Sequence, residues 1–104
     1  MSKQTTIELG VEVYRLVKKL PPEEEHVLSE MLMRATADVA VNIAQSEIDF
    51  LEKKRSQFLS EARGKIAVVE TLLLLCVELN YFGKEEIETA MNLCAELGRM
   101  LNES

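Results

Sequence analysis

Helix breakers are scarce in this chain, and their scarcity limits its fold more than any other feature. The 104 residues contain 4 glycines and 2 prolines, and the two prolines are neighbours, Pro21 and Pro22. Leu, Ala, Glu and Lys, which all favour helix, supply much of the rest. The chain is therefore predicted to be helical nearly throughout, as one all-α domain over residues 1–104.

Apolar residues at helical spacing divide the chain into four predicted helices. The proline pair ends the first helix, and Gly83 precedes the fourth. A single helix over residues 23–80 would be about 87 Å long, so a break is placed near residues 46–50, with Ser46 and Asp49 as candidate caps. The predicted helices cover approximately residues 5–20, 23–45, 50–80 and 84–102, and Thr5 or Thr6 is the expected first cap.

The first and third predicted helices are each more apolar than one neighbour requires. The first has two stripes roughly 140° apart, and the third has a main stripe with a second beside it. One stripe of the first helix consists of Ile7, Val11, Tyr14 and Val17. The surfaces predicted to contact other copies of the chain are Leu9, Val13, Leu16, Val68, Leu72, Leu75 and Leu79.

Three polar residues in apolar surroundings are predicted to have structural roles. Asn42 lies on the core-facing stripe of the second helix and is predicted to fix helix register through hydrogen bonds. Glu70 is expected to pair with Arg34 or with a neighbouring subunit. Gly64 and Gly98 interrupt helices at a cost of ~1 kcal/mol each, which close approach of another helix would offset.

The charge balance is acidic, with a formal net charge of −6, and this disfavours non-specific binding of nucleic acid or acidic membranes. The one local basic concentration consists of Lys53, Lys54, Arg55, Arg63 and Lys65. These residues could contact phosphate, or they could form a solvated helix face balanced by neighbouring carboxylates. No aromatic residues alternate with them, as stacking on single strands would require.

No pattern of catalytic, metal-binding or cofactor-binding residues is found. Glu23 and His26 have the spacing seen in di-iron bundles, but that chemistry needs two such motifs and this chain has 1 histidine. Cys76 and Cys94 lie within apolar patterns and are expected to be free buried thiols of a reducing cytosol. Because no catalytic pattern is found, the protein is expected to be non-enzymatic. Because no apolar signal or membrane-spanning segment is seen, it is expected to be cytoplasmic.

Two blocks of sequence resemble a known family. Residues 34–46, RATADVAVNIAQS, are similar to the motif R-A-A-x-S-I-P-x-N-I-A-E-G, and residues 58–71, FLSEARGKIAVVET, to F-L-x-I-A-x-G-S-L-x-E-L-E-T. Both motifs are typical of the bacterial four helix bundle proteins, which include proteins encoded in intervening sequences of large-subunit ribosomal RNA genes. The family is also similar to the accessory variability determinants of diversity-generating retroelements. The departures are Ala40 in place of proline, Gln45-Ser46 in place of Glu-Gly, Val68 in place of Glu, and the lack of a Gly-rich loop after the second helix.

The resemblance implies an up-down four-helix bundle that assembles into a homopentameric ring. The first functional hypothesis is accordingly a non-catalytic homo-oligomer that serves as a structural or interaction module. The alternative is an accessory factor that binds nucleic acid and a reverse transcriptase, which the retroelement relatives suggest. No residue pattern supports a third possibility, a carrier of small ligands.

Overall fold

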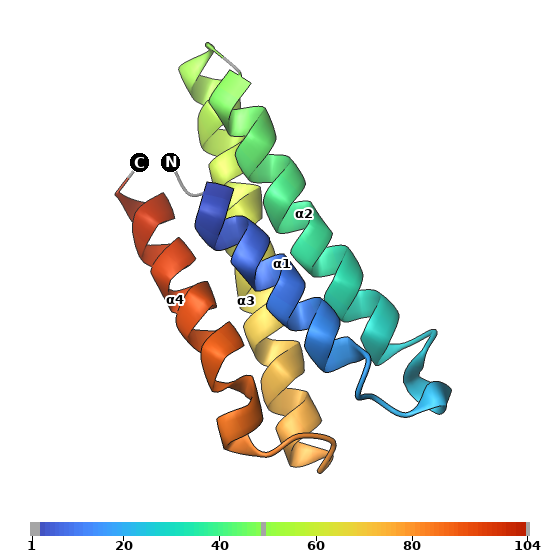
Figure 1. Ribbon diagram of the computed structural model, residues 1–104. Helices are drawn as coiled ribbons and strands as arrows, with labels where there is room; N and C mark the ends of the chain where they lie inside the picture. Colours follow the sequence, from blue (N-terminus) through green and yellow to red (C-terminus); the bar gives the residue numbers. More distant parts are fainter. Residues whose placement is uncertain (1–2, 49, 104) are drawn as a thin grey trace.

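Four α-helices make up the computed structural model, which describes residues 3–48 and 50–103 (Figure 1). They are α1 (Lys3–Val17), α2 (Leu28–Ile48), α3 (Glu52–Glu78) and α4 (Glu88–Asn102). Short 3-10 helices, η1 (Pro22–Glu24) and η2 (Lys84–Ile87), precede α2 and α4.

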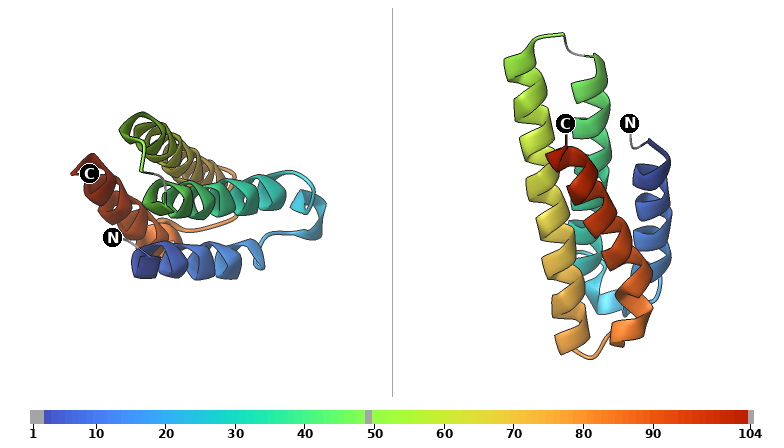
Figure 2. Two further views of the ribbon diagram at one scale, coloured as in Figure 1. Left: turned by 90° about the horizontal axis from the view of Figure 1, so that it is seen from above. Right: turned by 90° about the vertical axis from the view of Figure 1, so that its left-hand side faces the viewer.

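The helices form an up-down bundle in which each packs against the helices before and after it in sequence, and α1 also packs against α4. Figure 2 shows this arrangement from above and from the side. The described part of the chain measures 43 × 25 × 19 Å. Because α2 and α3 have 21 and 27 residues against 15 each in α1 and α4, the α2–α3 hairpin extends beyond the other two helices (Figure 1).

One contiguous core fills the space between the helices. Each helix contributes one buried stripe at three- and four-residue spacing, as expected for an amphipathic bundle helix. Fully buried members with large side chains are Leu9, Leu16, Leu32, Leu73, Leu97 and Leu101. Among the described residues, no helix is long and apolar enough to cross a membrane.

The predicted four helices and the break near residues 46–50 are present, but several ends differ. Helix α1 begins at Lys3, and Thr6 is a buried residue within it, so the predicted threonine cap is wrong. Helix α2 begins only at Leu28, because η1 starts at the second proline and a turn over residues 25–27 follows it. Ser46 lies inside the last turn of α2, where its Oγ donates a hydrogen bond to the Ile43 carbonyl at 2.6 Å. Asp49, the other predicted cap, lies outside the described residues.

The α3 C-terminus is closed by a left-handed residue. Asn80 has φ 65°, its N–H bonds to the Val77 carbonyl at 3.0 Å, and the Tyr81 N–H bonds to the Cys76 carbonyl at 2.9 Å. This is the Schellman arrangement, with Asn at a position that usually holds Gly. Beside it, the Tyr81 hydroxyl donates to the Glu24 carboxylate at 2.7 Å and joins the α3–α4 loop to η1.

We expect Asn80→Ala to lower the free energy of unfolding by about 1 kcal/mol, because a Cβ without a compensating polar group disfavours φ > 0. Asn80→Gly should leave stability unchanged or raise it slightly. Urea unfolding of both variants measures the difference. Equal stabilities for the alanine and glycine variants would contradict the role assigned to this residue.

Candidate interaction surface

The two apolar stripes of α1 differ in exposure, because one is buried in the core and the other faces solvent. Leu9, Val13 and Leu16 are at most 1% exposed and form part of the bundle's own core. The predicted contact of these three residues with other copies is therefore wrong. The exposed apolar stripe consists of Ile7, Val11 and Tyr14, which are 54%, 65% and 52% exposed.

On α3, the predicted second stripe is exposed to solvent except at one position. Val68, Leu75 and Leu79 are 40–47% exposed, whereas Leu72 is only 8% exposed and belongs to the core. The three exposed residues lie within about 40° of one another around the helix. Lys65, about 60° from Val68 on the same flank, forms an ion pair with Asp38 of α2 at 3.5 Å. The exposed stripe therefore lies along the edge of α3 that faces α2.

A shallow apolar groove of about 330 Å³ runs between α1 and α2. Small residues, Gly10, Ala37 and Ala40, line it together with the larger Ile7, Tyr14 and Met33. Ala37 and Ala40 are exposed, and a Cβ added to Gly10 would meet no atom within 4 Å. Nothing in the described part of the chain fills this groove, so another helix could approach closely there.

The outward face of α2 continues this apolar surface. Between Arg34 and Glu47 the one charged residue is Asp38, whose carboxylate is paired with Lys65. Ala44 and Val41 are exposed on the same helix. A stretch of helix whose single charge is already paired is unusual on the outside of a monomeric bundle, where the outer face is normally charged.

The predicted roles of the three polar residues need correction. Arg34 pairs with Glu30 one turn earlier at 2.7 Å, and both side chains are substantially exposed, so the predicted Arg34–Glu70 pair is not formed. Glu70 is half-buried on α3. Asn42 is also half-buried, and its Nδ2 donates to the Asp38 carbonyl of its own helix at 2.8 Å, so no bond across helices is seen for it among the described residues.

The helix glycines are not explained by packing within one chain. An added Cβ would meet no atom within 4 Å at Gly64 or at Gly98. Within one chain, the predicted close approach of another helix is therefore not found at either position. A mid-helix glycine still costs about 1 kcal/mol relative to alanine.

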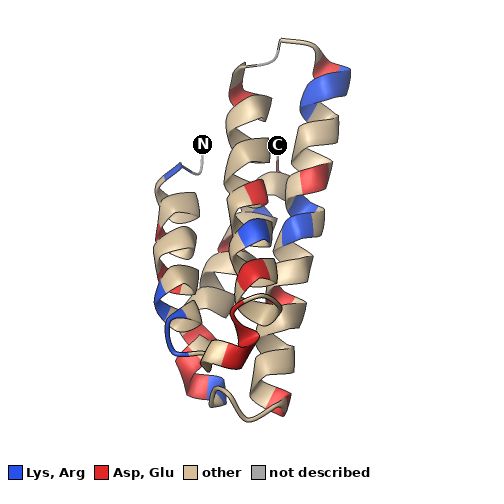
Figure 3. Ribbon diagram, turned by 90° about the vertical axis from the view of Figure 1, so that its right-hand side faces the viewer, with Lys and Arg blue, Asp and Glu red and all other residues tan. Residues whose placement is uncertain are grey.

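The five predicted basic residues do not form one patch. Lys53, Lys54 and Arg55 are exposed at the start of α3, where Lys and Arg gather in Figure 3. Arg63 instead reaches the Leu101 carbonyl of α4 at 3.5 Å, and Lys65 is paired with Asp38. Only the first three are therefore placed together for contact with an anionic partner.

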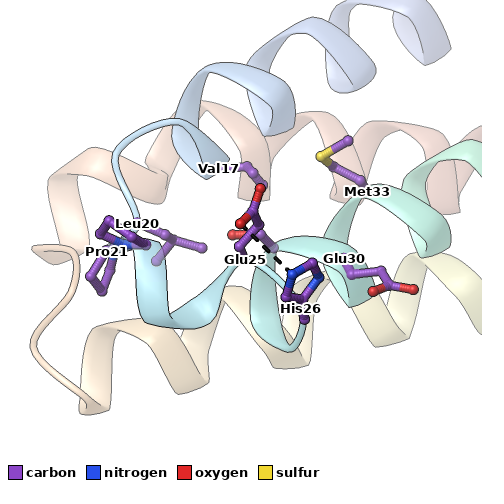
Figure 4. A pocket seen from close by; sticks show the side chains of 9 residues that line it. Val17, Leu20, Pro21, Glu25, His26, Glu30 and Met33 are labelled. Carbon is purple, nitrogen blue, oxygen red and sulfur yellow. Dashed lines mark ion pairs between the residues drawn. The ribbon is translucent and has the colours of Figure 1, made fainter.

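Titratable side chains show no catalytic arrangement among the described residues. His26 is 86% exposed, lies 3.8 Å from the Glu25 carboxylate, and lines an open hollow of about 550 Å³ between the end of α1 and the start of α2 (Figure 4). No group of three or more His, Cys, Asp or Glu in the described residues could hold a metal ion. Both cysteines are buried and free. Burial, reinforced by the charge of Glu24, raises the pKa of Cys76 above its ordinary value.

The fold and the exposed apolar stripes together define a small four-helix bundle with surplus apolar surface. The chain belongs to the 23S rRNA-intervening sequence protein family, whose model matches residues 2–103. A similar solved structure is that of a protein with unknown function from the S23 ribosomal protein family of Bacteroides thetaiotaomicron. It has 23% sequence identity and a TM-score of 0.90, and the match covers 99% of this chain and 96% of the other. No curated protein matches the sequence.

Proposed function

We propose that this protein is a non-catalytic, self-assembling helical bundle that serves as an interaction module in the cytoplasm. The observation that carries the proposal is the surplus apolar surface outside a complete core. Ile7, Val11 and Tyr14 on α1 are all more than half exposed, and Val68, Leu75 and Leu79 on α3 add a second surface. Contiguous apolar surface of this kind is typical of protein–protein contacts.

The physical reason is the free energy of apolar burial. Removing apolar surface from water contributes about 25 cal/mol per Å², so leaving these side chains exposed forgoes stabilisation that a partner can supply. Because the same surfaces are present on every copy, a second copy of the chain is the simplest partner. A ring of five is the assembly that the resemblance to the four helix bundle proteins implies, and it is part of the proposal.

Light scattering coupled to size-exclusion chromatography tests this function. At micromolar concentration we expect a mass five times that of the 11.8 kDa chain. A different multiple would change the ring size and keep self-assembly. A mass of 11.8 kDa at that concentration would contradict the proposal.

A second candidate function is that of an accessory factor that binds nucleic acid and a reverse transcriptase. It is favoured by Lys53, Lys54 and Arg55, three consecutive exposed cations at the α3 N-terminus, for which no ion pair is seen within residues 3–48 and 50–103. The dipole of α3 adds partial positive charge at the same place.

Gel-shift titrations with a structured RNA across a salt series test the second candidate. Replacing a cation that binds phosphate should reduce the slope of log affinity against log salt by roughly 1, so changing all three residues to Gln should flatten the dependence. Lys84→Gln, another exposed cation, is the control. Absence of binding by the unaltered protein at low salt would exclude this candidate.

A further inference from the structure

We propose that copies of the chain join head to tail, with the exposed α3 stripe of one copy seated in the α1–α2 groove of the next. The stripe consists of Val68, Leu75 and Leu79, and the groove is the one whose lining includes Gly10, Ala37 and Ala40. The inference rests on the self-assembly proposed above and specifies which surfaces make it.

The two surfaces are different and lie on opposite flanks of α2. The groove lies between α1 and α2. The stripe follows the α2-facing edge of α3, as the pairing of Lys65 with Asp38 shows. In Figure 2, α1 and α3 lie on opposite sides of α2. One copy can therefore use both surfaces at once, each with a different neighbour.

The shapes of the surfaces are complementary. Small residues, Gly10, Ala37 and Ala40, line the groove beside the larger Ile7, Tyr14 and Met33. Val68 and Leu75 project from α3 seven residues apart, which is the spacing of side chains that insert between those of a neighbouring helix. Glycine at position 10, where the same chain leaves open space, allows the backbone of that neighbour to come close.

Charges at the ends of the surfaces are also complementary. The exposed α1 stripe lies between Lys3 and Lys18, and these two lysines are about 22 Å apart along the helix. The α3 stripe begins after Glu61 and ends at Leu79, next to Glu78 in sequence, and the two glutamates are about 25 Å apart along the helix. Within residues 3–48 and 50–103 none of these four side chains forms an ion pair, although the Lys18 Nζ lies 5.0 Å from the centre of the Tyr14 ring.

Because of the direction of the helices, the lysines of one copy and the glutamates of the next lie at similar heights along the bundle axis. In an up-down bundle α1 and α3 run in the same direction (Figure 1), so they remain parallel between copies related by rotation about an axis along the bundle. Lys3 of one copy then lies near Glu61 of the next, and Lys18 lies near Glu78. A contact between two different surfaces of the same chain propagates from copy to copy, and rotation about one axis closes it into a ring.

Charge reversal tests the pairing of the ends. We expect Lys3→Glu with Lys18→Glu to weaken assembly about tenfold, and Glu61→Lys with Glu78→Lys to do the same, because attraction becomes repulsion at both ends. The chain that carries all four changes should assemble to within about threefold of the unaltered protein. Lys53→Glu with Lys84→Glu is the matched control, since both lysines are exposed outside the two surfaces. Failure of the four changes to restore assembly would contradict the pairing.

Blocking one surface at a time tests the head-to-tail arrangement. Ala37→Glu places a carboxylate in the groove, Leu75→Glu places one on the stripe, and Ala95→Glu on the exposed side of α4 is the control. Each blocked variant should be monomeric alone, with an unchanged circular dichroism spectrum. Mixed in equal amounts, the two should form a one-to-one pair through the intact groove of one and the intact stripe of the other.

The outcomes separate this inference from the proposed function. A monomeric unaltered protein would exclude self-assembly itself and the inference with it. An assembled protein whose Ala37→Glu and Leu75→Glu variants also assemble would exclude only the inference. If Leu75→Glu alone still assembled, groove would be meeting groove, and the head-to-tail contact would be wrong. Native mass spectrometry of the mixture distinguishes these results.

Discussion

Replacing Leu9 with alanine is expected to lower the free energy of unfolding by about 2–5 kcal/mol, because the side chain is fully buried in the core. Val11, two residues later on α1, is 65% exposed, so Val11→Ala should change the stability of the single chain by less than about 0.5 kcal/mol. Urea unfolding, at a concentration where light scattering shows a monomer, measures both.

The two variants should also differ in their effect on assembly. Val11→Ala removes apolar surface beside the groove and should weaken self-association while leaving the fold intact. Leu9→Ala should act on the fold first, lowering the unfolding midpoint at every protein concentration. If both substitutions reduced stability equally in the monomer, the assignment of one stripe to the core and the other to the surface would be wrong.

Alkaline pH is expected to destabilise the fold through Cys94. Burial, with a smaller contribution from the charge of Glu70, raises the pKa of this thiol from its ordinary value of 9.0 to about 12. Between these two values the unfolded chain loses the proton and the folded chain keeps it. This stabilising contribution is therefore fully present below pH 9 and declines by about 1.4 kcal/mol per pH unit as pH rises toward 12.

Urea titrations from pH 8 to pH 10.5, compared between the unaltered protein and Cys94→Ala, measure this decline. The alanine variant should be less stable at pH 8 because of the small cavity, yet its stability should fall less steeply with pH. Some decline should remain, since the pKa of Cys76 is also raised by burial and that of Tyr81 by its hydrogen bond to Glu24. Parallel curves would contradict the role of Cys94.

The end of α1 and the start of the α4 region are predictable because their signals are local, whereas the break between α2 and α3 is predicted only from the length that one continuous helix would have. The proline pair and Gly83 separate periodic segments, and the segments are long enough for the period to be unambiguous. The start of α2 is harder to place, because Pro22 favours the first turn of either a 3-10 helix or an α-helix, and the acidic residues after it suit both.

The choice between the two stripes of α1 is not predictable in the same way. Both stripes are apolar, and which one faces inward depends on how α1 rotates against α2 and α4, which is set by contacts distant in sequence. A local signal does exist for Arg34, because Glu30 lies one turn away on the same helix and competes with the more distant Glu70. On α3, exposure of Val68, Leu75 and Leu79 is predictable because a single core-facing arc could not include them.

The order of helices around the bundle bears on how quickly the native state forms. Of the four extensive helix–helix contacts in the described part of the chain, three join helices adjacent in sequence, and the contact between α1 and α4 joins remote segments. Folding speed falls as the average sequence separation of contacts grows, and helical domains with mostly local contacts fold in about microseconds to milliseconds. The α2–α3 hairpin, with the most extensive contact and the shortest loop, is the expected starting point. Docking of α4 against α1 then completes the structure.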